Sequence, residues 1–215
     1  MNFAVVTDNA GLLGYATMLT IGISLATIVL SLLLAFPLAV MRDLPIPPLK
    51  AAVATYSWVT RAMPALTLLF LAYYGLPQLG IYLDPVPAAI LGLTVSAAGY
   101  NMEYIRAGIL AVPETQYDAC RSLGMTRVMA LRRVIIPQAM RTILPPLTSN
   151  LTLLVKGSSL ASLVAVTELT GEGMALISFT YRPVPILITI AIIYLALNSV
   201  VVSIQAMVER RFAVE

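Results

Sequence analysis

Long apolar segments alternate with short polar ones along this chain. Crossing the hydrocarbon core of a bilayer takes roughly 20 mainly apolar residues in a helix. Five windows of about that length lie between charges and turn residues, at residues 11–40, 49–74, 85–104, 143–166 and 183–208. The pattern predicts an all-α integral membrane protein with five transmembrane helices, built as a single domain over residues 1–215.

The composition agrees with a membrane location. Hydrophobic residues make up 60% of the chain and charged residues 11%, and the mean hydropathy of +0.92 exceeds what a soluble domain needs for its core. With no histidine and one cysteine, Cys120, the sequence offers no Cys/His metal site and no disulfide framework. It also contains no G-x-x-x-x-G-K-[ST] loop. We therefore expect no catalytic, metal-binding or cofactor-binding residues in this chain.

Basic residues are concentrated in alternate connections between the predicted spans. Arg42 and Lys50 lie in the first connection, six arginines lie in the third, and Arg210 and Arg211 follow the last span. The second connection has no Lys or Arg, and the fourth has only Arg182. Because cytoplasmic loops carry the excess of Lys and Arg, this pattern places the N-terminus outside and the C-terminus in the cytoplasm. No basic residue precedes Arg42, so the first apolar segment is expected to be a retained helix rather than a cleaved signal.

Within the third connection, the loop at residues 107–141 is the most polar part of the chain. Pro113 suits the first turn of a helix, and Gly124 can adopt the left-handed conformation that ends one. Thr126 can cap a second helix, which Pro137 is expected to end. Two short cytoplasmic helices joined at a glycine turn would suit docking to another protein. A solvated basic loop and a helix-turn-helix DNA-binding element are the alternatives, although the stretch is short for the separate core that a DNA-binding element needs.

Ionisable residues inside a membrane span are costly and mark functional sites by default. Two stand out, Arg61 in the second predicted span and Lys156 in the fourth. Hydroxyl residues recur around Lys156 at steps of three or four, on one helical face: Ser149, Thr152, Ser159 and Ser162. This face either lines a polar cavity or packs against another helix through hydroxyl hydrogen bonds. In the first span, Thr20, Thr27 and Ser31 belong to a similar series, which we expect to be helix-packing residues.

The second predicted span combines Arg61 with Pro64, which removes a backbone hydrogen bond and favours a kink. Arg61, Pro64 and Thr67 share one helical face, which we expect to meet the polar face of the fourth span. Arg61 is expected either to contact a transported substrate or to pair with Glu103 or Glu168. Glu103 can also pair with a basic residue three positions later. Glu168 lies at the outer end of the fourth span, in a region interpreted as a mobile outer gate, a docking surface for a binding protein or an ordinary solvated loop.

The central stretch resembles the cytoplasmic signature of ABC importer permeases. In that signature an E-A-A triplet is followed by a glycine after three residues, then by nine residues and an I-x-L-P ending. The matching residues here are Asp118, Ala119, Cys120, Gly124, Val134, Ile136 and Pro137. Asp118 is one methylene shorter than the usual glutamate, and Cys120 replaces an alanine. The segments "RAMPALTLLFLAYYGLP", "YNMEYIRAGILAVP", "IIPQAMRTILPPL" and "KGSSLASLVAVTEL" resemble the polar amino-acid branch specifically, so the similarity covers nearly the whole chain.

The resemblance implies a type I ABC importer (MetI-like) fold in the bacterial plasma membrane. The two short helices would be coupling helices that dock a separate ATP-binding subunit, which holds ATP and Mg²⁺. A second permease chain, the same or related, would complete the pathway, and an external solute-binding protein would deliver a polar amino acid; no nucleic acid is implied. The docking candidates are Gln116, Asp118, Ala119, Cys120, Arg121, Gly124 and Met125. The candidate substrate-pathway residues are Arg61, Pro64, Thr67, Thr152, Lys156, Ser159 and Glu168.

A membrane protein of this composition could also be a channel, a secondary transporter or an intramembrane enzyme. A passive channel or an ion-coupled secondary transporter is disfavoured by the absence of a detectable inverted repeat and of a membrane-central Asp or Glu relay. An intramembrane enzyme would need a nucleophile beside a base, and Ser158 or Ser159 near Lys156 is the only such pair in the sequence.

Overall fold

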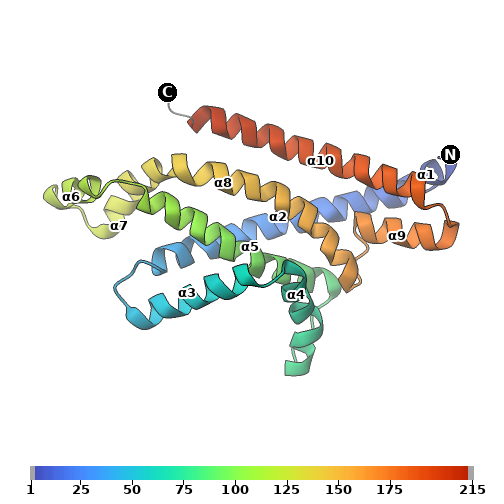
Figure 1. The fold of residues 1–215 in the computed structure, drawn as a ribbon, viewed down its shortest axis with the longest axis horizontal. Helices are drawn as coiled ribbons and strands as arrows, with labels where there is room; N and C mark the ends of the chain where they lie inside the picture. The colour runs from blue at the N-terminus through green and yellow to red at the C-terminus, as the bar shows by residue number, and fades with distance from the viewer. Residues whose placement is uncertain (1–2, 213–215) are drawn as a thin grey trace.

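The computed structural model describes residues 3–212, and this part of the chain is helical with no β-strand. After the short α1 (Ala4–Asp8), the bundle is built from α2 (Ala10–Met41), α5 (Pro85–Leu110), α8 (Ile136–Gly157) and α10 (Pro183–Phe212). These long helices run roughly side by side, with α5 at the centre of the bundle (Figure 1). The predicted all-α architecture is confirmed.

Two helices, α2 and α10, are long and apolar enough to cross a membrane by themselves. The number of candidate spans rises to four if each of two bent helix pairs counts as one crossing. Helix α5 has 26 residues, which is long enough for a fifth crossing. It is less apolar because other helices, rather than lipid, surround much of it, and small residues then favour close helix packing.

Glycines on α5 allow its neighbours to approach closely. A Cβ atom at Gly92 would lie 2.7 Å from the Cα of Leu69, and a Cβ at Gly108 would overlap the side chain of Ile143 on α8. Between these two positions, Ala98 and Met102 are fully buried. Two of the buried apolar clusters therefore lie along α5, and a third joins α1, α2, α9 and α10.

The second predicted span is broken rather than kinked. Helix α3 (Pro47–Ala62) ends at Met63, and α4 (Ala65–Phe70) continues at 108° to it. Met63 is extended, with φ −89° and ψ 141°, because the ring of a following proline disfavours the helical conformation. The chain then passes through a π-helical turn, η1 (Leu71–Gly75), and a 3₁₀ turn, η2 (Leu76–Leu79). The prediction of one kinked helix over residues 49–74 is therefore wrong.

The fourth predicted span begins much earlier than expected. Helix α7 (Arg127–Ala130) passes through the π-helical turn η3 (Leu131–Ile135) directly into α8. Pro137 lies in the first turn of α8, where a missing N–H is tolerated. The π-helical turn changes the hydrogen-bond register just before the proline, as the bond from Ile136 N–H to the Leu131 carbonyl shows. The prediction that Pro137 ends the second short helix is wrong for this reason.

Beyond α8, the chain forms the 3₁₀ segment η4 (Ser158–Val164) and then the helix α9 (Leu169–Thr180). Helix α9 is bent by 48° from the preceding helix. The sequence predicts a connection at these residues, whereas the structure forms a helix there, which contacts α2 and α10.

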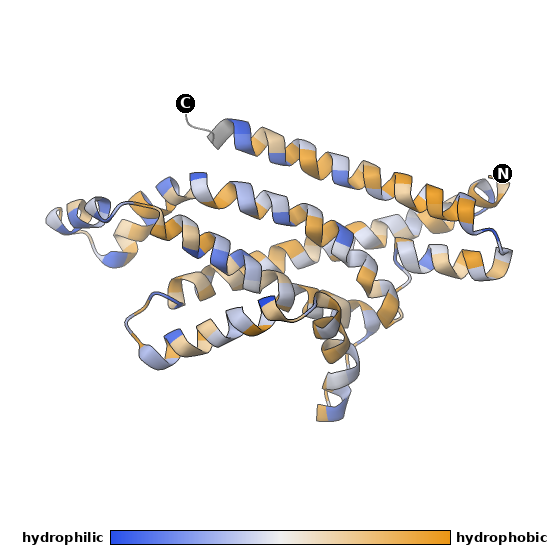
Figure 2. Ribbon diagram, viewed as in Figure 1, coloured by the Kyte–Doolittle hydropathy of each residue, from blue (hydrophilic) through white to orange (hydrophobic). Residues whose placement is uncertain are grey.

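The two ends of the bundle differ in polarity. Helix α6 (Glu114–Ser122), α7 and the connection from α2 to α3 lie at one end, whereas α1 and α9 lie at the other (Figure 1). Hydrophilic residues are concentrated in α6 (Figure 2). The basic connections recognised in the sequence thus gather at the α6 end of the molecule.

Candidate functional site

The glycine turn after α6 has the geometry that the sequence predicts. Gly124 has φ +69°, in the left-handed region. Its N–H donates to the Arg121 carbonyl at 2.9 Å, and the N–H of Met125 donates to the Cys120 carbonyl at 3.0 Å. These two bonds form a Schellman motif, which satisfies the last carbonyls of α6. The turn is therefore fixed by its own backbone hydrogen bonds.

The helix after the turn begins at the predicted cap. The hydroxyl of Thr126 accepts a 3.3 Å hydrogen bond from the backbone N–H of Met129. The segment from α6 to α7, residues 114–130, is called the docking loop after its predicted role. Because α7 continues into α8, this loop is attached directly to a long helix of the bundle. A free recognition helix, which a DNA-binding element would need, is not formed in this part of the structure.

The docking candidates divide into outward and inward residues. Asp118 and Arg121 are exposed and form a 3.2 Å ion pair with each other. Cys120 is only 3% exposed and anchors α6 to the molecule. The side chain of Gln116 accepts a 3.1 Å hydrogen bond from Gln138 on α8. The surface open to a partner is formed by Asp118, Ala119, Arg121 and Gly124, with Met125 half-buried.

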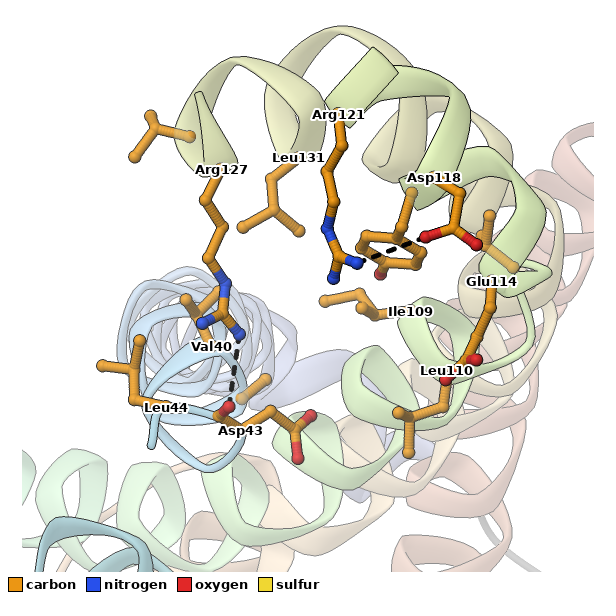
Figure 3. Close-up of a pocket in the computed structure, with 14 residues that line it drawn as sticks. Val40, Asp43, Leu44, Ile109, Leu110, Glu114, Asp118, Arg121, Arg127 and Leu131 are labelled. Carbon is orange, nitrogen blue, oxygen red and sulfur yellow. Dashed lines mark hydrogen bonds and ion pairs between the residues drawn. The ribbon is translucent and has the colours of Figure 1, made fainter. Parts of the chain in front are cut away.

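A pocket of about 420 Å³ lies behind α6, between the docking loop and the end of α2. Its walls are mainly apolar, and Figure 3 shows charged side chains around it. On one wall the guanidinium of Arg127 donates to the backbone carbonyl of Asp43 at 3.3 Å. Tyr117 also lines the pocket, where burial raises the pKa of its phenol. The tyrosine side chain therefore stays neutral at physiological pH.

Arg61 lies in the last turn of α3, just before the helix break. Its Nη1 atom is 3.8 Å from Oε1 of Glu103, and 46% of its side chain is exposed. Its guanidinium also lies 6.0 Å from the centre of the Tyr100 ring. Of the pairings considered from the sequence, the structure forms the one with Glu103. Glu103 also lies 3.9 Å from Arg106, as its spacing on the helix predicts.

The other pathway candidates are spread over two separate helices. Pro64 and Thr67 are exposed around the start of α4. The polar face with Thr152 and Lys156 is on α8, and α5 lies between α3 and α8 (Figure 1). The prediction that the two polar faces meet is wrong within one chain, because α5 separates them.

Lys156 is exposed, and its amino group has no hydrogen-bond or ion-pair partner among the described residues. The hydroxyl of Ser159 donates to the Lys156 carbonyl at 2.7 Å, and that of Ser158 donates to the Val155 carbonyl at 2.8 Å. Neither serine hydroxyl contacts the lysine amino group in this part of the chain. The nucleophile and base pair of an intramembrane enzyme is therefore not assembled in this structure.

Glu168 is fully buried, so the interpretation of its surroundings as an ordinary solvated loop is wrong. Its Oε1 accepts 3.0 Å hydrogen bonds from the backbone N–H groups of Thr170 and Gly171, which caps α9. Its Oε2 accepts from the Tyr194 hydroxyl at 2.9 Å and from the Thr20 hydroxyl at 3.2 Å. The carboxylate thus joins α2, α9 and α10. It performs a structural role within this chain and is not open to a substrate.

A buried polar contact at the centre of the bundle was missed by sequence reasoning. Asn150 on α8 donates to the side-chain oxygen of Asn101 on α5 at 2.7 Å. Asn101 in turn donates to the Ser31 hydroxyl on α2 at 3.1 Å, which confirms a packing role for Ser31. The signal available in the sequence for this contact was Asn150, which follows Ser149 of the polar face in the fourth predicted span. These contacts fix three long helices relative to one another.

Comparisons with known proteins identify the family. A family model described as "Binding-protein-dependent transport system inner membrane component" matches residues 44–214. The octopine transport system permease protein OccM of Rhizobium meliloti is 36% identical over 200 residues, covering 89% of this chain and 82% of that protein. The probable glutamine ABC transporter permease protein GlnM of Bacillus subtilis (strain 168) is 34% identical over 201 residues, covering 92% of each chain.

Solved structures agree with this result. An amino acid ABC transporter crystallised with histidines contains a chain that is 33% identical and superposes with a TM-score of 0.90, covering 98% of this chain and 99% of that chain. The inward-facing MetNI methionine ABC transporter shares the fold, with a TM-score of 0.80 at 20% identity. Our chain belongs to the family of binding-protein-dependent transport system inner membrane components, the permease subunits of ABC importers. In these importers the ATPase activity lies in a separate subunit.

Proposed function

We propose that this chain is the membrane-spanning permease subunit of an ATP-driven importer of polar amino acids or closely similar zwitterions. It forms half of a translocation pathway in the bacterial plasma membrane, and a second permease chain, the same or related, forms the other half. An external solute-binding protein delivers the substrate. The support for the substrate class is that similar permeases are named for octopine, L-cystine and glutamine transport.

The observation that carries the proposal is the exposed docking loop at one end of the bundle. Its turn is fixed by the Schellman bonds around Gly124, and α7 continues into the membrane helix α8. A partner that moves α6 would therefore also move α8. In the proposed complex the partner is an ATP-binding subunit, which holds ATP and Mg²⁺ and contacts the outward residues Asp118, Ala119, Arg121 and Gly124.

The proposed orientation follows from the distribution of basic residues. Most of the Lys and Arg residues belong to connections at the α6 end of the molecule. The excess of basic residues marks the cytoplasmic side of a membrane protein. We therefore place α6 and the C-terminus in the cytoplasm and the N-terminus outside, where the binding protein docks.

The substrate pathway is proposed to pass Arg61 and Lys156. Arg61 and Glu103 present opposite charges 3.8 Å apart on a half-exposed surface beside the helix break. These groups are complementary to the carboxylate and ammonium of an amino acid. Lys156 offers a second cation that no residue of the described chain neutralises. Pro64, Thr67, Thr152 and Ser159 belong to the same two surfaces.

Transport by the purified complex tests this function. The importer, with its co-purifying ATPase and its binding protein, would be reconstituted in vesicles and supplied with radiolabelled L-glutamine, L-arginine, L-histidine or L-cystine. We expect uptake only with hydrolysable ATP and the binding protein. A passive channel or an ion-coupled transporter would instead continue uptake when ATP is replaced by a non-hydrolysable analogue.

A further inference from the structure

A series of polar contacts begins at the docking loop and leads toward the interior helices. Arg127, in the first turn of α7, donates from Nη2 to the backbone carbonyl of Asp43 at 3.3 Å. The carboxylate of Asp43 accepts a 3.1 Å hydrogen bond from Nε of Arg106 on α5. Asp43 follows the end of α2. The docking loop, the connection from α2 to α3 and the central helix α5 therefore meet at one residue.

The series continues from α5 to α3. The Nη1 atom of Arg106 lies 3.9 Å from Oε2 of Glu103, about one helical turn earlier. The other carboxylate oxygen of Glu103 accepts a 2.6 Å hydrogen bond from the Ser57 hydroxyl and lies 3.8 Å from Nη1 of Arg61. Both Ser57 and Arg61 are on α3, and Arg61 is two residues before Met63, where the helix breaks. The contacts thus connect the docking loop with the region of the break.

The pocket behind α6 makes these contacts important for the position of the docking loop relative to α2. It separates part of the docking loop from the end of α2, so close packing does not join the two surfaces there. In Figure 3 the Arg127 side chain reaches Asp43 at the edge of the pocket, while Arg121 pairs with Asp118 elsewhere on its wall. Partly exposed ion pairs of this kind contribute little to stability by themselves. Their arrangement in one continuous series points to a positional role.

We propose that this series of six residues, Arg127, Asp43, Arg106, Glu103, Ser57 and Arg61, transmits movement of the docked ATP-binding subunit to α3 and its break. Asp43 and Arg106 are positioning residues that link the moving loop to the pathway helices. The inference rests on the proposed function as an ATP-driven importer. Each state of the ATP-binding subunit favours one position of α3 through these contacts.

The test compares ATP hydrolysis and uptake by the same reconstituted complex. Asp43→Asn keeps the size of the side chain and removes the charge that holds Arg106. We expect normal assembly and retained ATP hydrolysis, but a rise of about fivefold or more in ATP hydrolysed per amino acid imported. Asp43→Glu, which keeps the carboxylate, should restore most of the coupling. Glu114→Gln is the matched control, since Glu114 lines the same pocket and has no ion-pair partner among the described residues.

Arg106, the ion-pair partner of Asp43, provides an independent variant. Arg106→Gln, on α5, should raise the same ratio, and the Asp43→Asn and Arg106→Gln double variant should be no worse than either single variant. If Asp43→Asn weakens assembly, Arg106→Gln decides the question. The proposal would be overturned if Arg106→Gln hydrolysed as much ATP per imported amino acid as the wild type. It would also be overturned if this variant lost ATP hydrolysis and uptake to the same extent. A wild-type complex without ATP-dependent uptake would instead refute the importer function.

Discussion

The hydroxyl of Tyr194 on α10 donates a 2.9 Å hydrogen bond to the buried carboxylate of Glu168, which caps α9. The two residues are 26 positions apart in the sequence. Their contact, together with that of Thr20, fixes the end of the bundle opposite to the docking loop. The two ends therefore differ in their polar contacts: a buried carboxylate joins three helices at one end, whereas partly exposed ion pairs lie at the other.

Tyr194→Phe removes one donor from the buried Glu168 carboxylate. We expect a loss of about 1 kcal/mol in the free energy of unfolding, because a buried carboxylate oxygen then keeps only one of its two hydroxyl donors, that of Thr20. Thermal unfolding of the purified protein in detergent measures the change. Tyr82→Phe is the control, because Tyr82 is 80% exposed and should leave stability unchanged. Equal unfolding temperatures for both variants would show that the buried contact contributes nothing.

Gly124→Val tests the docking loop. A β-branched residue at φ +69° is strained by about 1–2 kcal/mol, so the Schellman turn should distort and release the ATP-binding subunit. Co-purification with that subunit should fall, while membrane insertion stays intact. Gly124→Asn, which tolerates the left-handed conformation better, should retain more of the partner. Unaltered co-purification of the valine variant would contradict a role for this turn in docking.

Lys156→Met tests the polar face of α8. The change removes an exposed cation and keeps a long side chain, so uptake should fall by about tenfold or more while complex assembly is preserved. The other lysine of the chain supplies the control, since Lys50→Met makes the same chemical change in the first turn of α3. Full uptake by Lys156→Met would reduce the lysine to a structural residue.

Arg61→Gln tests the second proposed substrate contact. Removing the guanidinium should raise the half-saturating substrate concentration for uptake by about tenfold, because a substrate carboxylate loses its charged partner. Arg61→Lys keeps the charge and should have a smaller effect. Uptake would be measured over a range of substrate concentrations in reconstituted vesicles. An unchanged half-saturating concentration in both variants would show that Arg61 does not bind substrate and only pairs with Glu103.

The turn and the helix cap of the docking loop could be predicted from the local chemistry of the sequence. Gly124 and Thr126 have conformations that their side chains favour, whatever surrounds them. Pro64 indicated where the helix of the second span is interrupted, but the 108° bend at this break could not be predicted from the proline. The direction of α4 depends on its packing at Gly92, more than 20 residues away.

The errors at Pro137 and Glu168 have different physical causes. A proline usually ends a helix, but the π-helical turn before Pro137 lets the chain continue without the missing N–H. A glutamate after a membrane span usually faces water, but Glu168 is buried by residues distant in sequence, including Thr20, 148 positions earlier. Non-local contacts of this kind are invisible in a single sequence.

The proposed function requires this chain to work as a permease subunit with a separate ATP-binding partner. Native mass spectrometry of the complex, extracted in mild detergent from its own host, identifies such a partner and counts its copies. Our account predicts an ATP-binding chain in equal number with the permease chains, with either two copies of this chain or one copy and a related permease. A chain found alone, or only with itself, under conditions that preserve other membrane complexes would contradict the account.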